Sequence, residues 1–319
     1  MTIFARKAQL IAGLETTYGV AGSPVPKGST DSMLTVGVTI NPYTGPVVSR
    51  GFDRATLGNQ SVINTNPGSE ITYGVEFAGS GTPATAPKWA RLIKACGFAE
   101  TQNSPTSGGW TYKPLSTSFP SLSQYLEIDG FMHEQLGARG NFGFTLARGQ
   151  IPVMNFRFMG KYTKPYAGAH SGVSTTAFQS PVAVTNENTP TFTFSGKSFK
   201  AESFSFDIGN SITHRNVING NEVMITDRAA TGTFLIETPD LDDSPSVNLF
   251  NYVESHGGVV TGAFSLVHGT SSGGIITISA PAVQLSTVTY GNSDGIHTSS
   301  IQALFIPSSG NDEISINVK

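Results

Sequence analysis

The chain has 319 residues, of which 38% are hydrophobic, 10% aromatic and 13% charged, with a formal net charge of −3. This apolar content is enough to build a core and excludes an intrinsically disordered chain. The single cysteine excludes a disulfide framework, a cysteine-based zinc site and an iron–sulfur centre. No stretch approaches 18 consecutive apolar residues, so the sequence predicts no membrane span.

Alternating apolar and polar residues dominate the chain and predict a mainly β protein, because successive strand side chains point to opposite faces. In the first part of the chain, strands are expected at residues 33–40, 70–77, 110–113 and 124–131, followed by a hairpin over 141–160. In the second part they are expected at 202–208, 231–237, 262–267 and 274–279, followed by a hairpin of 283–290 with 296–306.

Two segments have the sequence signals of short helices. Residues 86–97 place Pro87 near the first turn and Gly97 after the last. Residues 244–257 begin with Ser-Pro, carry apolar residues three and four positions apart, and end on glycine. A helix is therefore predicted in each part of the chain.

The order strand, loop, strand, helix, two strands and hairpin occurs twice, displaced by about 160 residues. We interpret this as a duplication and predict two tandem, mainly β domains, each with one short helix. The expected organisation is an N-terminal arm (1–32), a first domain (33–165), a linker rich in Gly, Ser, Thr, Asn and Pro (166–198) and a second domain (199–319).

The two parts of the chain differ in charge. Residues 1–165 hold 14 Lys and Arg against 9 Asp and Glu, a balance of +5. Residues 166–319 hold 5 against 13, a balance of −8. Such a division is typical of a chain with an oppositely charged partner, which is either nucleic acid or another copy of the same chain.

The sequence gives no support for an enzyme, a cofactor or a metal site. The pattern G-x-S-x-G around Ser271 matches hydrolases, but it joins two predicted strands, so a turn is the ordinary interpretation. Cys96 is expected as a small buried side chain. Adjacent His133 and Glu134 point to opposite faces of a strand and form no dyad. The acidic run 240–243 suits the start of the second helix better than calcium.

Four strings of residues resemble the major tail, or tail tube, proteins of long flexible-tailed bacteriophages. They are RKAQLIAGLETTYG at 6–19, FAGSG at 77–81, LIKACGF at 92–98 and YGNSDG at 290–295. The resemblance covers nearly the whole chain. It implies two tandem tail-tube-like domains, each a β-sandwich or β-barrel with one short flanking helix. It also implies a structural virion protein, without catalytic activity, that polymerises into stacked rings of six domains forming the conduit for genome delivery.

The resemblance also implies partners and a location. Relatives with one domain form hexamers, so a chain with two domains is expected to form rings of three chains, with a hexamer of chains as the alternative. Other phage tail proteins are expected as partners, with double-stranded DNA only as non-specific passing cargo. The protein is expected in the virion tail after assembly in the bacterial host cytoplasm.

In such a ring the basic and acidic parts of the chain become neighbours at every lateral contact, and their opposite charges favour docking. The lumen is expected to be neutral or acidic and rich in Ser and Thr, because a conduit should not grip DNA. Stacking and lateral contacts are expected from apolar and basic residues of the N-terminal arm, of the long loop 50–68 and of the C-terminal segment: Phe4, Leu10, Ile11, Arg50, Phe52, Arg54, Leu57, Val62, Ile63, Ile314, Ile316 and Val318. Packing inside a domain is the competing explanation for each apolar residue in this set.

Three other functions stay open at this point. A tail hub, distal tail or tail terminator protein has the same fold but a lower copy number. A soluble carbohydrate-binding β-sandwich is expected to expose aromatic side chains on one sheet face. A hydrolase using Ser271 requires a reactive serine.

Overall fold

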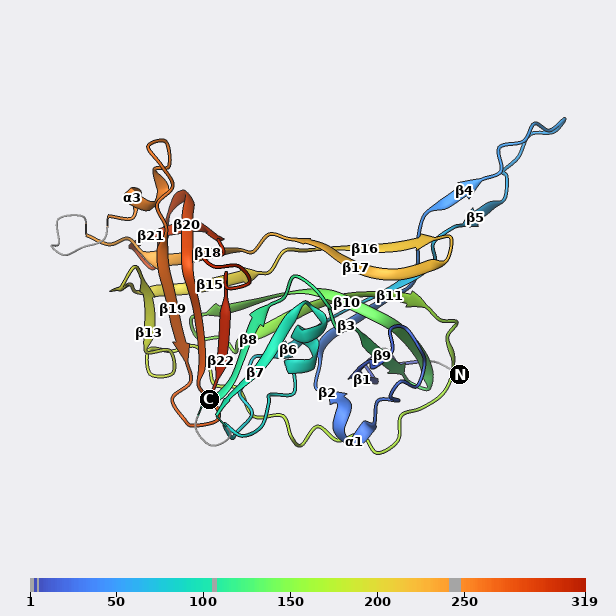
Figure 1. Ribbon diagram of the computed structural model, residues 1–319, viewed down its shortest axis with the longest axis horizontal. Helices are drawn as coiled ribbons and strands as arrows, with labels where there is room; N and C mark the ends of the chain where they lie inside the picture. Colours follow the sequence, from blue (N-terminus) through green and yellow to red (C-terminus); the bar gives the residue numbers. More distant parts are fainter. Residues whose placement is uncertain (1–2, 5, 105–107, 241–247) are drawn as a thin grey trace.

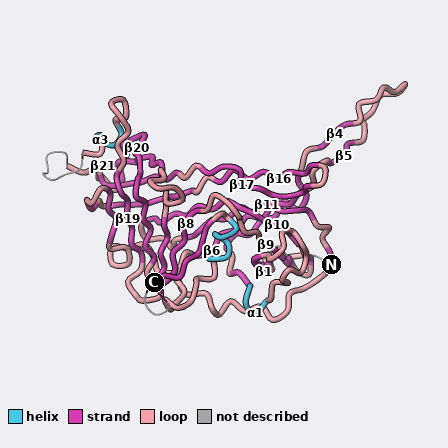
Figure 2. Tube along the Cα trace, in the orientation of Figure 1, coloured by secondary structure: helices cyan, strands magenta, loops and turns pink. Residues whose placement is uncertain are grey.

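The computed structural model describes residues 3–4, 6–104, 108–240 and 248–319. This part of the chain contains 22 strands and three short helices, which confirms the mainly β fold (Figures 1 and 2). The first part comprises β1 (Ala8–Leu14), α1 (Gly28–Asp31), β2 (Ser32–Met33), β3 (Val36–Thr44), β4 (Val47–Ser49), β5 (Val62–Asn64), β6 (Gly68–Glu76), α2 (Ala90–Ala95), β7 (Phe98–Ser104), β8 (Gly109–Pro114), β9 (Leu122–Ile128), β10 (Phe131–Ala147), β11 (Val153–Tyr162) and β12 (Tyr166–Ala167). The second part comprises β13 (Thr191–Phe194), β14 (Lys197–Ser198), β15 (Ala201–Asp207), β16 (Asn210–Val217), β17 (Gly220–Arg228), β18 (Thr231–Glu237), α3 (Phe250–Val253), β19 (Gly262–His268), β20 (Ile276–Ser293), β21 (Ile296–Phe305) and β22 (Ser315–Val318).

The first part of the chain forms two sheet layers that share the long strand β10. Strands β3, β6, β11 and β10 pair in that order, all antiparallel. The N-terminal half of β10 also pairs with β9, which in turn pairs with β1 and then β2. A bulge between Gln135 and Ala138 separates the two halves of β10, and Gly137 adopts a φ of +61° there. Bulges bend strands, so β10 passes from one layer to the other.

The second part of the chain repeats this order of pairing. Strands β15, β18, β21 and the C-terminal half of β20 pair in the same antiparallel order. The N-terminal half of β20 pairs with β19, then β13 and β14. In each part, a short strand that follows the four-stranded set pairs antiparallel with the long strand: β12 pairs with β10, and β22 pairs with β20.

The displacement between corresponding elements is not constant along the chain. β3 begins at Val36 and β15 at Ala201, 165 residues later, whereas β9 begins at Leu122 and β19 at Gly262, 140 residues later. The difference arises because the β7–β8 hairpin lies between helix and strand in the first part, and the described residues of the second part have no equivalent.

The two parts are joined by main-chain pairing. β15 pairs with the C-terminal half of β10, which produces one eight-stranded sheet in the order β3-β6-β11-β10-β15-β18-β21-β20. At the far end of the other layer, β22 lies between β20 and β8. Among the described strands, no series of pairings returns to its starting strand, so the sheets are open and packed as a sandwich.

A continuous apolar core fills the space between the layers and across the junction. Phenylalanines from both parts of the chain form its centre, including Phe142, Phe144, Phe156, Phe204, Phe206, Phe234, Phe264 and Phe305. Phe204 alone contacts the rings of five others. Aromatic side chains bury large apolar areas, so this cluster stabilises the junction between the two parts of the chain.

Both predicted helices occur, but each is shorter than its sequence signal. The segment 86–97 contains α2 over Ala90–Ala95, with four buried residues. Of the segment 244–257, the structure describes residues 248–257, and α3 covers Phe250–Val253. The acidic run 240–243 lies outside the described residues from 241 onward.

The segments expected as an arm and a linker contain strands. Residues 8–14 of the predicted arm form β1, paired with β9 over its full length. Residues 166–198, predicted as a linker, contain β12, β13 and β14. Alternation is weak in such short strands, so their sequence resembles a connection.

Candidate interaction surfaces

Residues 45–67, which connect β3 to β6, project from the body of the molecule and include strands β4 and β5 (Figure 1). We call this segment the arm. Its two strands pair only with each other, with Val48 opposite Ile63 and Ser49 opposite Val62. An isolated two-stranded hairpin is marginally stable in water. Among the described residues, main-chain pairing with the rest of the sheet does not hold the arm in place.

The arm carries an unusual concentration of exposed apolar side chains. Val47, Val48, Phe52, Leu57, Val62 and Ile63 are all exposed, and Leu57 is fully accessible. A projecting element with apolar residues on both faces is typical of an interaction site. The predicted residues of the loop 50–68 thus lie together on the arm.

Two arginines flank the single aromatic ring of the arm. The guanidinium carbon of Arg54 lies 4.6 Å from the centre of the Phe52 ring, and that of Arg50 lies 5.3 Å from it. The Phe52 carbonyl oxygen also accepts a hydrogen bond of 2.7 Å from the Gln60 side chain. Cation–π contacts keep the two positive charges near an apolar ring. The tip of the arm thus presents both basic and apolar groups.

The corresponding hairpin of the second part, β16–β17, lies against the first part of the chain instead of projecting (Figure 1). Arg139 of β10 donates hydrogen bonds to the carbonyl oxygens of Val223 (2.7 Å) and Phe119 (2.9 Å). The Tyr18 hydroxyl accepts a hydrogen bond of 2.6 Å from the Val223 amide. Val223 and Ile225 are buried by this contact. The hairpin ends at the base of the arm, where the Asn66 side chain donates to the His214 carbonyl oxygen at 2.8 Å.

The eight-stranded sheet ends in two edges that have no partner among the described residues. At one end, β3 pairs only with β6. At the other end, one edge of β20 is paired with β21 as far as Ser293. The opposite edge of β20 is paired with β19 only as far as Val283, so beyond Val283 this edge has no partner strand among the described residues. Free edges are sites where another strand adds, and neither β3 nor residues 286–293 carry a charged side chain. Neither edge could be predicted from the sequence, because a strand's own residues do not reveal which of its two edges is paired.

Five of the predicted contact residues are buried in the core instead. Leu10 and Ile11 of β1 are 1% and 3% exposed, and Ile314, Ile316 and Val318 are at most 1% exposed. Packing inside the chain accounts for their apolar character. Phe4, by contrast, is 57% exposed, and its amide donates to the Asp129 carboxylate at 3.0 Å. Exposed candidates therefore come from the arm and from Phe4.

The face of the eight-stranded sheet that points away from the core is polar. A shallow depression runs across six neighbouring strands and is lined mainly by neutral polar side chains, including Thr72, Thr145, Asn155, Ser205, Thr231, Thr233 and Gln302. Arg157 donates two hydrogen bonds to the Glu70 carboxylate, at 2.7 and 2.9 Å, so its charge is balanced. Asp207 accepts a hydrogen bond from Asn141 at 2.9 Å.

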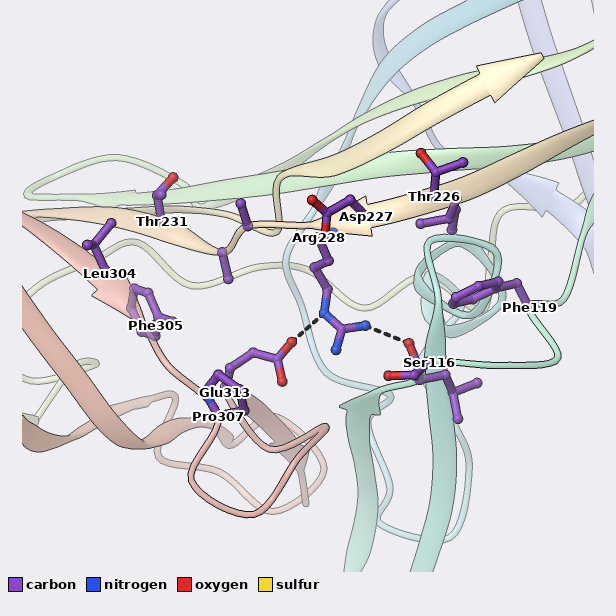
Figure 3. A pocket seen from close by; sticks show the side chains of 14 residues that line it. Ser116, Phe119, Thr226, Asp227, Arg228, Thr231, Leu304, Phe305, Pro307 and Glu313 are labelled. Atoms are coloured by element: carbon purple, nitrogen blue, oxygen red, sulfur yellow. Dashed lines mark hydrogen bonds and ion pairs between the residues drawn. The ribbon is translucent and has the colours of Figure 1, made fainter. Parts of the chain in front are cut away.

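A second pocket, of about 460 Å³, lies where β17 meets the segments after β8 and β21 (Figure 3). The guanidinium of Arg228 points at the carboxylate of Glu313 and contacts it, and a second nitrogen donates to the Leu115 carbonyl oxygen at 2.5 Å. Both charged side chains are largely buried. Arg228 is thus paired with one carboxylate oxygen of Glu313, whereas the second, Oε2, is buried without a hydrogen-bond partner among the described residues. The pocket lies at the contact between the β16–β17 hairpin and the segments after β8 and β21.

The candidate catalytic groups are not assembled into a site. Ser271 lies in a turn between β19 and β20, two antiparallel strands, so the strand-to-helix elbow of hydrolases is absent there. Cys96 is fully buried, and burial raises the pKa of its thiol. Within the ranges that the structure describes, no three His, Cys, Asp or Glu side chains are grouped to hold a metal ion. No helix of the described chain is long and apolar enough to cross a membrane.

Comparison with known families identifies the architecture. Residues 5–315 match the phage tail tube protein family. The chain belongs to this family. No curated protein matches the chain. Tail tube proteins are structural components of the bacteriophage tail, which agrees with the resemblance of the four sequence strings.

Two of those strings have clear structural roles in this tail tube protein. In the string 6–19, the Glu15 carboxylate accepts hydrogen bonds from Ser121, Ser123, Gly19 and Gly137, at 2.5 to 2.8 Å. It thereby fixes the bulge at which β10 changes layer. In the string 77–81, the Gly81 amide donates to the Gly273 carbonyl oxygen at 2.9 Å and joins the two parts of the chain.

Proposed function

We propose that this tail tube protein assembles into rings of three chains that stack into the conduit through which the phage genome leaves the capsid. In this proposal, residues 33–165 and 199–319 are two tube domains, residues 1–32 precede the first domain and residues 166–198 link the two, and strands in both of these segments pair with strands of the domains. The repeated order of strand pairing supports the duplication. The observation that carries the proposal is the eight-stranded sheet, in which two similar halves are joined edge to edge while both ends stay free.

Three such sheets joined end to end contain 24 strands. At a spacing of ~4.8 Å and a tilt of ~40°, 24 strands close into a cylinder about 50 Å in diameter. Side chains on the inner face reduce the bore to roughly 40 Å, since facing layers of side chains occupy ~10 Å. A DNA duplex, whose grooves are about 8 Å deep, passes through such a bore without tight contact.

The polar outer face of the sheet suits the lining of this bore. Its side chains are mainly threonine, serine, asparagine and glutamine, and Arg157 is paired with Glu70. A neutral surface lacks the several free cations that phosphate binding requires. DNA would therefore slide past as non-specific cargo, and it is not a bound ligand in this proposal.

The arm and Phe4 are proposed to make contacts between copies. The exposed apolar residues Phe52, Leu57, Val62 and Ile63, together with Arg50 and Arg54, would become buried against a neighbouring chain in the same ring or in the next ring. Assembly would take place in the bacterial host cytoplasm, and other tail proteins would cover the two ends of the tube.

Electron microscopy of the purified protein at increasing concentration tests this function. Hollow tubes with three-fold symmetric cross-sections are the expected result. Rings that never stack would instead favour a terminator or hub role, and six-fold sections with twice the mass per ring would favour a hexamer of chains. A protein that stays monomeric at every concentration contradicts the proposal.

A further inference from the structure

The junction between the two parts of the chain has a defined register. Gly143, Phe144 and Thr145 of β10 lie opposite Asp207, Phe206 and Ser205 of β15. The rings of Phe144 and Phe206 stack with their centres 5.2 Å apart. One residue further along, the Ile208 amide donates to the Phe142 carbonyl oxygen at 3.1 Å. This junction shows how one half of the chain accepts the edge strand of another half.

The registers inside each half identify equivalent positions. The pairing with the second layer ends at Ala138 in β10 and at Val283 in β20, and we align the two long strands at these positions. Four residues beyond Ala138 lies Phe142; the same step beyond Val283, with the extra residue of the bulge between Leu285 and Thr287, reaches Val288. Phe142 lies opposite Phe156 and Val288 opposite Ile301, which pair in turn with Tyr73 and Phe234. Val288 of β20 therefore corresponds to Phe142 of β10, and Tyr290 corresponds to Phe144.

The same comparison relates the two edge strands β15 and β3. Phe206 of β15 lies opposite Gly232, which is two residues before Phe234 in β18. Ile40 of β3 lies opposite Ile71, which is two residues before Tyr73 in β6. Phe234 and Tyr73 are equivalent positions. Ile40 of β3 therefore corresponds to Phe206 of β15, and Asn41 corresponds to Asp207. The free edge of β20 is the counterpart of the edge of β10 that is occupied within the chain.

We propose that β3 of one copy pairs antiparallel with residues 289–291 of β20 in the next copy, and that this contact repeats the internal β10–β15 junction. In this register Asn41 lies opposite Thr289, Ile40 opposite Tyr290, and Thr39 opposite Gly291. The inference rests on the proposed ring and adds to it the strands and the register of the lateral contact. The contact is head-to-tail, and such a contact closes a ring of three chains when it rotates each copy by one third of a turn relative to the last.

The chemistry of the two edges fits this pairing. Tyr290 is 59% exposed, although the equivalent Phe144 is buried against Phe206. In the proposed contact the Tyr290 ring covers Ile40, as Phe144 covers Phe206. An uncharged, exposed edge is a hazard in a protein that remains monomeric, and a partner strand removes the hazard.

Proline sets the length of the proposed pairing. Pro42 follows Asn41 and occupies the position equivalent to Ile208. Proline has no amide hydrogen, so the bond that Ile208 donates to Phe142 is missing from the new contact. Pairing should therefore end at Asn41, one hydrogen bond earlier than in the internal junction.

Cysteine pairs test the register in assembled protein. The variant Asn41→Cys with Thr289→Cys places the two thiols directly opposite one another, within the Cα separation that a disulfide or a short bis-maleimide can bridge. The matched control, Asn41→Cys with Ser293→Cys, moves the second thiol four residues, about 13 Å along the strand. Both sites of each pair lie outside the core, and the native Cys96 is buried.

The expected result is covalent dimers and trimers from the first pair, at least tenfold more than from the control pair, in preparations that form tubes. Tubes that give equal cross-linking for both pairs, or none for the first, overturn the proposed contact while leaving the tube function intact. Absence of tubes from the unsubstituted chain is a different result and contradicts the function itself.

A second variant covers the case in which cysteine substitution disturbs assembly. Tyr290→Asp should raise the concentration needed for tube formation at least tenfold without changing the thermal unfolding of the monomer. Tyr166→Asp, at another exposed tyrosine, is the control. Normal assembly of Tyr290→Asp overturns the inference.

Discussion

Arg228 and Glu313 form a largely buried ion pair that ties the β16–β17 hairpin to the segment before β22. Removing one partner of such a pair leaves an uncompensated buried charge, which costs about 3–5 kcal/mol. Arg228→Ala should therefore lower the free energy of unfolding by about 3 kcal/mol, measured by urea denaturation. The double variant Arg228→Met with Glu313→Leu should recover most of this loss, and equal losses in both variants would show that the charge is not the cause.

Gly273 is required where the Ser271 turn meets the string 77–81. Its φ is +83°, and a Cβ there would lie 2.1 Å from the Gly81 carbonyl carbon. Gly273→Ala should cost at least ~2 kcal/mol, from backbone strain and from overpacking. Gly295→Ala is the matched control, because Gly295 has a φ of +85° in open space and should lose only about 1 kcal/mol. Similar unfolding midpoints for the two variants would contradict the steric argument.

His268 gives the folded chain a pH dependence. Burial lowers the pKa of its imidazole. The unfolded chain therefore binds a proton near pH 6.5 that the folded chain does not bind, so stability falls as the pH drops below about 6.5. His268→Gln should flatten this part of the stability profile in urea titrations between pH 5 and 8. An unchanged slope would assign the effect to another group, such as His133, whose pKa burial also lowers.

At the scale of elements, strands with strong alternation were predictable and short strands were not. The expected strand 231–237 coincides with β18, and 202–208 lies one residue from β15. By contrast, β12, β13 and β14 lie in a segment that reads as a linker, because two to four residues carry no reliable period. Leu10 and Ile316 could not be placed in the core from sequence, because burial depends on pairing with distant strands.

The arm is the element whose removal should separate folding from assembly. Replacing residues 47–64 by an Asn-Gly turn removes the exposed apolar residues but keeps the base, where Asn66 contacts His214. We expect a folded monomer with a thermal midpoint within a few degrees of the parent and no tubes by electron microscopy. The single change Leu57→Ser should weaken assembly to an intermediate degree. Normal tubes from the deletion variant would assign the arm no role in assembly.

At the scale of the whole molecule, the opposite charges of the two parts predict a salt effect on assembly. The basic first part (+5) and the acidic second part (−8) become neighbours when sheets join head-to-tail. Salt at 0.5 M reduces the screening length to roughly half of its value at 0.1 M, which weakens charge steering. Tube formation followed by light scattering should therefore slow several-fold over this range. Faster assembly in salt would show that burial of apolar surface, and not charge, sets the rate.

The position of β22 has a consequence for the timing of folding during synthesis. Residues 315–318 lie between β20 and β8, yet they are translated about two hundred residues after β8. In a nascent chain, the edge of β8 that pairs with β22 therefore stays uncovered. The sheet layer that contains β8 is incomplete until residues 315–318 have been translated. Completion of this layer is therefore a late step in folding, because it waits for a strand that is synthesised long after the strand it covers.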